Sequence, residues 1–155
     1  MGETPLSDTI RERIIQNIMT RLGLIRTANG YLTAIGANVY RVRKRLEEEE
    51  CPGCVVFPRP EEGSVTYGRQ VCDMPVDVEA AALFGDTNPS IVAEQLLGDL
   101  IKALIATDPT GGLAESVQYV SGGTPEYPED GDLSVGVTVR VMVKYETLKG
   151  NPFSQ

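Results

Sequence analysis

The sequence predicts an α+β domain in which two amphipathic helices pack on a mainly antiparallel sheet with an extended β arm. Three observations support this fold class. Alternating apolar residues near the C-terminus indicate a long strand, two separate segments have helical spacing, and the elements follow the order helix, strands, helix, strands. Because no interval repeats and no change of composition marks a boundary, residues 1–155 are interpreted as one domain.

The last long segment gives the clearest signal in the chain. Every second position is apolar and the positions between are mostly polar or small, which is the period of a strand with one buried face. At about 3.4 Å per residue this strand would run on the order of 45 Å, more than a small core requires. We therefore expect its sheet to reach beyond the domain, or its edge to be covered by another chain. The apolar positions are Leu133, Val135, Val137, Val139, Val141, Val143 and Tyr145.

Two segments are typical of amphipathic helices. The first runs from Thr9 to Leu22 after a cap at Ser7 or Asp8. The second starts at Asn88, a good cap for a helix with proline in its first turn, and continues to residue 106. Both have apolar residues three or four positions apart, so each can bury one side against a sheet.

Four further segments are predicted to supply the rest of the sheet. Residues 121–132 are rich in glycine, proline and acidic residues and are expected to form a loop, and 61–63 a turn. The predicted strands are a basic strand over 38–46, a short strand over 54–57, a longer extended stretch over 64–79, and a short strand over 116–120.

The composition argues against several classes of function. The formal net charge is −8 at pH 7, from 22 acidic and 14 basic residues, which disfavours a protein that grips duplex DNA. Histidine is absent, so the familiar catalytic triads cannot be assembled and the commonest metal ligand is missing. No apolar run approaches the roughly 18 residues of a membrane span. The first residues show no secretory signal, so we expect a cytoplasmic origin.

A block of basic residues at 41–45 is followed closely by a block of acidic residues at 47–50. They fit a solvated hairpin, in which exposed ion pairs contribute only about 0 to 1 kcal/mol each. They also fit an electrostatic contact between identical copies arranged head to tail. The second interpretation, extended to the polar face of the final strand and to residues 150–152 beyond it, gives a set of candidate interface residues. Within the two blocks and that strand, these are Arg41, Arg43, Lys44, Arg45, Glu47, Glu48, Arg140 and Lys144.

The three cysteines leave several interpretations open. Cys51 and Cys54 have the spacing of a zinc knuckle or a redox pair. Only Cys72 and carboxylates could complete a metal site, because the chain has no histidine. A redox pair would normally open a helix, which lowers the thiol pKa, and this pair does not. We expect free thiols and no cofactor, with Cys51, Cys54 and Cys72 as the residues to consider for a metal.

The order of these elements resembles that of the tail terminator proteins of long-tailed bacteriophages, also called tail completion or minor tail U-type proteins. The resemblance spans most of the chain. It rests on the N-terminal helix, the basic strand, the extended arm, the helix that starts at 88–90, and the valine-rich strand that ends in a Tyr-x-Thr-x-x-Gly-Asn-Pro pattern at 145–152. The motif at 51–54 departs from the family pattern.

The resemblance implies a virion structural protein without enzymatic activity, which forms a hexameric ring on the last ring of the tail tube. Such a ring ends tube growth and offers a surface at which the head or neck joins. The implied partners are further copies of itself, the tail tube protein, and a head-neck connector or stopper protein. Genome DNA would pass through the ring without specific binding, and no membrane would be involved. The protein would be in the host cytoplasm during assembly and then at the head-proximal end of the tail.

Three other hypotheses stay open at this point. The chain could be another head-to-tail neck protein or a tail-tube subunit. It could be a small metal-binding or redox module built on its cysteines. It could also be a small enzyme that uses carboxylates alone, although no acidic pair lies in an apolar setting in the sequence.

Overall fold

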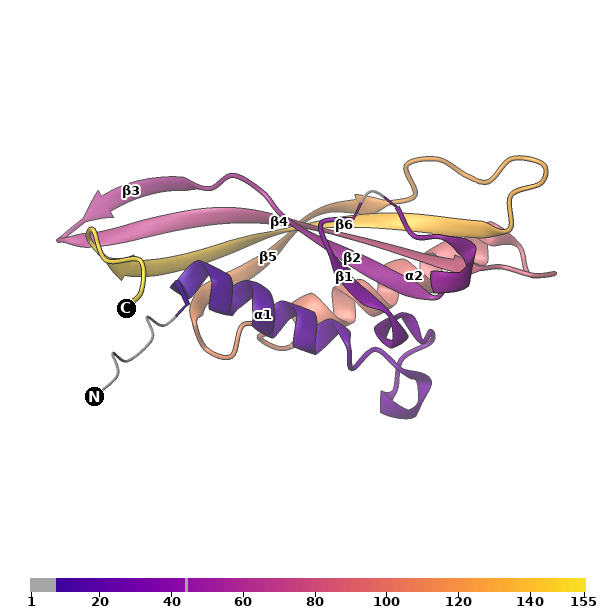
Figure 1. Ribbon diagram of the computed structural model, residues 1–155, viewed down its shortest axis with the longest axis horizontal. Helices are drawn as coiled ribbons and strands as arrows, with labels where there is room; N and C mark the ends of the chain where they lie inside the picture. Colours follow the sequence, from indigo (N-terminus) through magenta and orange to yellow (C-terminus); the bar gives the residue numbers. More distant parts are fainter. Residues whose placement is uncertain (1–7, 44) are drawn as a thin grey trace, which may run out of the picture.

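The computed structural model describes residues 8–43 and 45–155, and in this part of the chain a six-stranded sheet carries two α-helices (Figure 1). The predicted α+β fold is therefore confirmed. Short 3-10 turns occupy Thr27–Asn29, Ile35–Ala37 and Glu48–Glu50. The helices are α1 (Ile10–Leu22) and α2 (Pro89–Ile101), and a π-helical turn, η4 (Lys102–Ala106), continues α2. The strands are β1 (Val39–Arg41), β2 (Gly53–Pro58), β3 (Glu62–Thr66), β4 (Arg69–Leu83), β5 (Ala114–Gly123) and β6 (Ser134–Leu148).

The two longest strands, β4 and β6, form the centre of the sheet. They pair antiparallel over 15 residues each, from Arg69 opposite Leu148 to Leu83 opposite Ser134. The strand order is β1-β2-β4-β6-β5, and β3 pairs with the half of β4 that β2 leaves free. All pairs are antiparallel except β1 with β2.

The predicted alternation of the final strand is confirmed along β6. Its odd-numbered positions from Val135 to Thr147 are buried, whereas the even-numbered positions are partly buried or exposed. Their partners on β4 are buried as well from Cys72 to Ala82, so the two strands share one apolar face. Leu133 is a correction, because it precedes the strand and is 55% exposed.

Both helices pack on this apolar face (Figure 1). Helix α2 contacts β4, β5 and β6, whereas α1 contacts β1 and β2. Asn88 caps α2 as predicted, since its side chain accepts a hydrogen bond of 2.9 Å from the Ser90 N–H. Of the two caps predicted for α1, Ser7 lies outside the described residues and Asp8 is wrong, because the Thr9 hydroxyl caps the helix and accepts a bond of 3.0 Å from the Glu12 N–H.

A buried carboxylate on α2 fixes the connection between α1 and β1. Asp99 is only 3% exposed. Its oxygens accept hydrogen bonds from the Leu32 N–H (3.0 Å), the Thr33 N–H (2.7 Å) and the Thr33 hydroxyl (2.6 Å). Because these donors satisfy both of its oxygens, the Asp99 side chain can be buried although it forms no ion pair with the basic residues that the structure describes.

Several strand boundaries differ from the prediction. The basic segment contributes only the three residues of β1, and the chain leaves the strand at Val42, where φ is 51°. Residues 61–63 are not a turn, since β3 begins at Glu62 and the turn lies at 67–68. Strand β5 is longer than expected and takes up the start of the predicted loop. The extended β arm is not confirmed, because β3 pairs along β4 within the same sheet.

Two substitutions on α2 test the assignment of its buried side. Leu100 is fully buried in the core, whereas Ile91 is 54% exposed. Leu100→Ala should lower the free energy of unfolding by about 2–5 kcal/mol through the lost packing and the cavity left behind. Ile91→Ala, the matched control, should change it by no more than about 0.5 kcal/mol. Urea denaturation followed by circular dichroism measures both, and equal effects would contradict this orientation of the helix.

Candidate subunit interface

The face of the sheet opposite the helices carries polar and charged side chains. Asp73 lies opposite Lys144 and Asp77 opposite Arg140 on neighbouring strands of this face. An open groove of about 720 Å³ runs over it, and none of its lining residues belongs to a helix of the described part of the chain. The groove is lined by Pro60, Glu62, Asp73, Pro75, Glu115, Ser116, Gln118, Met142 and Lys144.

The other end of the same face is partly covered by the chain itself. Arg45, Leu46 and residues 125–126 line a smaller hollow there together with Val55 and Gly136. Val55 is 1% exposed although its neighbours Cys54 and Val56 point into the helical core, so this end of the sheet is buried on both sides.

Asp77 joins two arginines beside the groove. Its carboxylate accepts bonds from Arg140 (2.7 and 2.9 Å) and Arg59 (2.8 Å), and the residue is 6% exposed. The hydrogen bonds from Arg140 lower the pKa of Asp77, burial opposes this shift, and Arg59 adds to it. Arg140, predicted to be an interface residue, is thus also part of an ion-pair cluster within the chain.

Two of the other basic candidates are paired within the chain. Arg41 forms two bonds of 2.7 Å with Glu12 of α1. Arg43 pairs with Glu50, and its guanidinium lies 4.3 Å from the centre of the Tyr40 ring. These contacts favour the interpretation of the two charge blocks as a solvated hairpin. They argue against a contact between copies that uses every residue of the two blocks.

The remaining candidates of the two blocks lie at the surface. Arg45, Glu47 and Glu48 are exposed, and Glu47 caps the short turn Glu48–Glu50. Lys44 lies outside the described residues. Together with Lys144 in the groove, the exposed residues stay candidates for contact with a partner.

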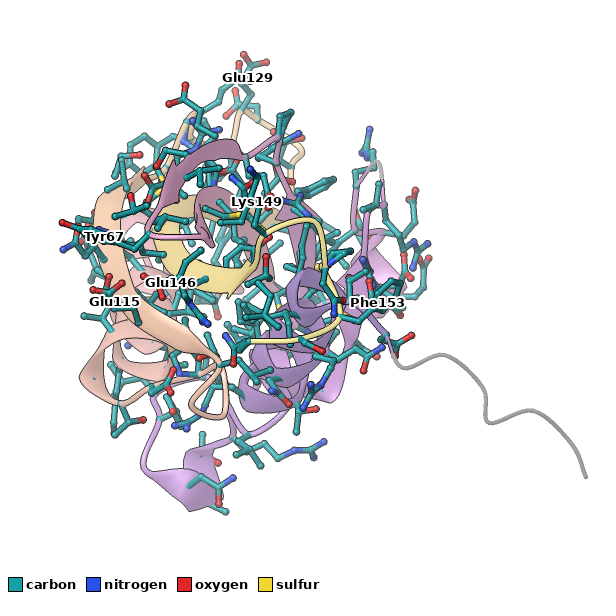
Figure 2. All side chains as sticks on the ribbon, turned by 90° about the vertical axis from the view of Figure 1, so that its left-hand side faces the viewer. Tyr67, Glu115, Glu129, Glu146, Lys149 and Phe153 are labelled. Atoms are coloured by element: carbon teal, nitrogen blue, oxygen red, sulfur yellow. The ribbon has the colours of Figure 1, made fainter. Side chains whose placement is uncertain are left out.

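Two strands, β3 and β5, form opposite borders of the sheet. Each is paired on one side only within the described part of the chain. All five residues of β3 are exposed, and most of β5 beyond Val117 is exposed as well. Figure 2 looks at the end where β3 turns into β4, and there Tyr67 points away from the molecule, with its whole surface exposed.

The three cysteines are free thiols and do not form one site. Cys54 lies opposite Ala80, eight residues along β4 from Cys72, a separation on the order of 27 Å at about 3.4 Å per residue. Cys54 lies in the core, and its burial raises the pKa of its thiol to about 12. Cys51, in contrast, lies outside the core. The residues considered for a metal are therefore not brought together, and among the residues described no three His, Cys, Asp or Glu side chains are placed so that they could hold a metal ion.

The segment after β6 folds back on its own chain. The Pro152 carbonyl accepts a bond of 2.9 Å from the Ile10 N–H at the start of α1. The Gln155 side chain donates to the carbonyls of Leu113 (2.6 Å) and Glu146 (3.1 Å). Residues 150–152, expected to contact another subunit, are thus used in part to close the fold.

Sequence reasoning missed a second polar cluster at this end of the molecule. Glu61 accepts hydrogen bonds from the Tyr145 hydroxyl (2.5 Å) and from Arg11 (2.7 Å). It thereby links β6 to α1 beside the core. Burial works against the ionised form of Glu61, but the bonds from Tyr145 and Arg11 outweigh it and lower its pKa. The polar positions of Asp77 and Glu61 were visible in the sequence, but their partners depend on strand register and long-range contacts.

No protein-family model and no curated protein sequence matches this chain. Among the described residues, no helix is long and apolar enough to cross a membrane.

The Asp77 cluster should make a pH-dependent contribution to stability. Asp77→Asn should lower the free energy of unfolding by about 1–3 kcal/mol near neutral pH, because charge-assisted bonds to two arginines are weakened. The pKa of Asp77 is lowered in the folded state, so this contribution is present above the unfolded value of about 3.9 and is lost as the pH falls through the folded pKa.

Urea denaturation across that pH range measures the difference between the two proteins. Asp73→Asn is the matched control, because Asp73 is exposed on the same face of β4 and has no ion pair among the described contacts. A difference for Asp77→Asn that stayed constant down to about pH 2 would show that the charge of Asp77 is not its source.

Proposed function

We propose that this chain is a structural, non-enzymatic tail terminator of a long-tailed bacteriophage, which forms a hexameric ring at the head-proximal end of the tail tube. The ring ends tube growth and provides the surface that a head-neck connector or stopper protein joins. Its partners are copies of itself, the tail tube protein and that neck protein. Genome DNA passes through without specific binding, and the mature location is the virion.

The observation that carries this proposal is the difference between the two faces of one long sheet. The apolar face is covered by both helices, so the domain is complete as a folded unit. The opposite face presents a mixed polar groove, and the sheet has uncovered borders at β3 and β5. Interfaces that form between already folded subunits have this mixed polarity.

A ring also requires two different surfaces that match each other. Heterologous contacts close into a ring when the rotation between copies suits the copy number. Opposite borders of one sheet, together with the exposed basic and acidic residues 45, 47 and 48, give the subunit two such sides. The order of elements and the pattern at 145–152 support the phage assignment.

The charge of the chain is compatible with a DNA channel. A net charge of −8 repels the phosphate backbone, so a ring of such subunits would let DNA slide without gripping it. This argument concerns the whole subunit and does not depend on which residues line the channel.

The position of the protein in the particle tests the proposal. The genes beside its own should encode neck and tube proteins. Tubes assembled from the neighbouring tube protein, mixed with this chain and viewed by negative-stain electron microscopy, should carry one ring at one end and stop growing. Many stacked copies would instead indicate a tail-tube subunit. A ring found only between head and tail terminator would indicate another neck protein, and a protein that fails to bind tubes or their ends would refute the proposal.

Lys144 provides a test of the groove as a contact surface. Lys144→Glu should weaken assembly at least about tenfold, because it places a fourth carboxylate among Glu62, Asp73 and Glu115. The melting temperature should shift by no more than about 2–4 °C, which corresponds to about 1 kcal/mol. Arg140→Glu is a poorer probe, since it also breaks the cluster at Asp77.

Lys149→Glu is the matched control, because it makes the same change of charge outside the groove. Native mass spectrometry and tube binding measure assembly. If Lys144→Glu and Lys149→Glu assemble equally well, the groove is not part of a subunit contact.

A further inference from the structure

We infer that β3 of one copy of this chain adds as an antiparallel strand to the free border of β5 in the next copy, so that the sheet continues from subunit to subunit. The inference rests on the proposed function in one respect, the self-assembly of the chain. It goes beyond it by naming the two strands that meet.

The first argument is that most of each border lacks charge, the exceptions being Glu62 at the start of β3 and Glu115 near the start of β5. Soluble proteins usually protect a free strand edge with charged residues, proline or a short strand, because its unpaired backbone groups recruit other strands. Although 23% of this chain is charged, residues 116–124 and 63–68 contain no Asp, Glu, Lys or Arg. β5 is also 10 residues long. Its two irregular positions bend it, and its one charged residue, Glu115, lies near its start.

Exposed apolar side chains accompany both borders. Val65 on β3 is 52% exposed, and Tyr67 in the following turn is fully exposed. On β5, Tyr119 is 43% and Val120 49% exposed. Aromatic and β-branched residues are the ones that stabilise cross-strand pairs. Strand addition would therefore bury apolar surface and satisfy the backbone of both edges.

The directions of the strands suit a head-to-tail repeat. β3 is antiparallel to β4, β4 to β6, and β6 to β5, so β3 and β5 run in opposite directions within one subunit. When the next copy is placed in the same orientation, its β3 lies antiparallel to β5. The short strand β1 is a poorer partner, because it has three residues and its Arg41 is held by Glu12.

Matching the two faces of the sheet selects a register. Val65 and Tyr119 both lie on the helix side of the sheet. The residue opposite Tyr119 is a core residue, and the residue opposite Val65 lies on the same face of β4 as the core residues. Thr66 and Gln118 both lie on the groove side. Pairing Val65 with Tyr119 and Thr66 with Gln118 keeps every side chain on its own face. In this register Glu62 of one copy lies near Gly123 of the other copy, away from the carboxylate of Glu115.

The two borders are offset along the strands in the way that a closed sheet requires. β5 lies beside residues 138–145 of β6, whereas β3 lies at the level where β4 faces residues 144–148. Strands that continue around a closed barrel tilt and stagger relative to one another. The offset between β3 and β5 is therefore compatible with a tilted, closed arrangement of the sheet.

Disulfide trapping between copies tests the pairing. Val65→Cys and Tyr119→Cys are made separately in a Cys51→Ser background, since Cys54 and Cys72 are buried. The two proteins are mixed in equal amounts, the assembled fraction is isolated and oxidised with copper phenanthroline, and covalent dimers are measured on a non-reducing gel. The mixture should give at least about tenfold more dimer than either variant alone, because only facing residues have the Cβ separation that a disulfide needs.

Ser64→Cys is the matched control. It is next to Val65 but on the other face of β3, so its mixture with Tyr119→Cys should stay at background. A second pair, Thr66→Cys with Gln118→Cys, tests the same register on the groove side if the first pair folds poorly. Circular dichroism and melting temperature confirm that each variant is folded.

Other outcomes overturn the inference. Dimer formed by Tyr119→Cys alone would indicate a two-fold contact of β5 with itself, and an assembled fraction without mixed dimer, or a chain that never assembles, would exclude the strand pairing. The proposed function fails separately. Binding to tube ends without the mixed dimer refutes only the pairing, whereas mixed dimer without binding to tubes refutes the tail function and leaves the pairing intact.

Discussion

The antiparallel pairing of β4 with β6 is the constraint on which the rest of the structure depends. Fifteen residues of each strand pair without a shift in register, so every second residue of both faces the same side. This places a continuous row of valines in the core that the helices cover and fixes the opposite row, with Asp73, Asp77, Arg140 and Lys144, on the other face. A slip of one residue would exchange the two faces, so the apolar pattern enforces the register.

Polar contacts at the margins of the core complete the fold. Asp99 holds the connection after α1, Glu61 joins α1 to β6, and the segment that ends in Pro152 meets the first residue of α1. Because these contacts bring distant parts of the chain together, they stabilise the domain as a unit. The charged face of β4 and β6 is left for other contacts, apart from the Asp77 cluster, which joins the two strands to Arg59.

The division between a closed face and an open face bears on function. A domain whose core is complete can fold before it assembles, and the proposed assembly would use its groove and free borders as contacts between folded subunits. The placement of β3 and β5 at opposite borders gives each subunit two different sides. Arg41 and Arg43 form ion pairs within the chain. The charge blocks at 41–50 therefore offer fewer residues to a partner than their composition indicates.

The sequence by itself determined the fold class, both helices and the buried face of the final strand, because these follow from periods of 3.6 and 2 that local residues define. Only the tertiary structure decided the site. The partners of Asp77 and Arg140, the distance between Cys54 and Cys72, the short β1 and the free borders at β3 and β5 depend on register and strand order. These are relations between residues far apart in the chain, so no local pattern contains them. They form only when packing chooses one arrangement of the elements.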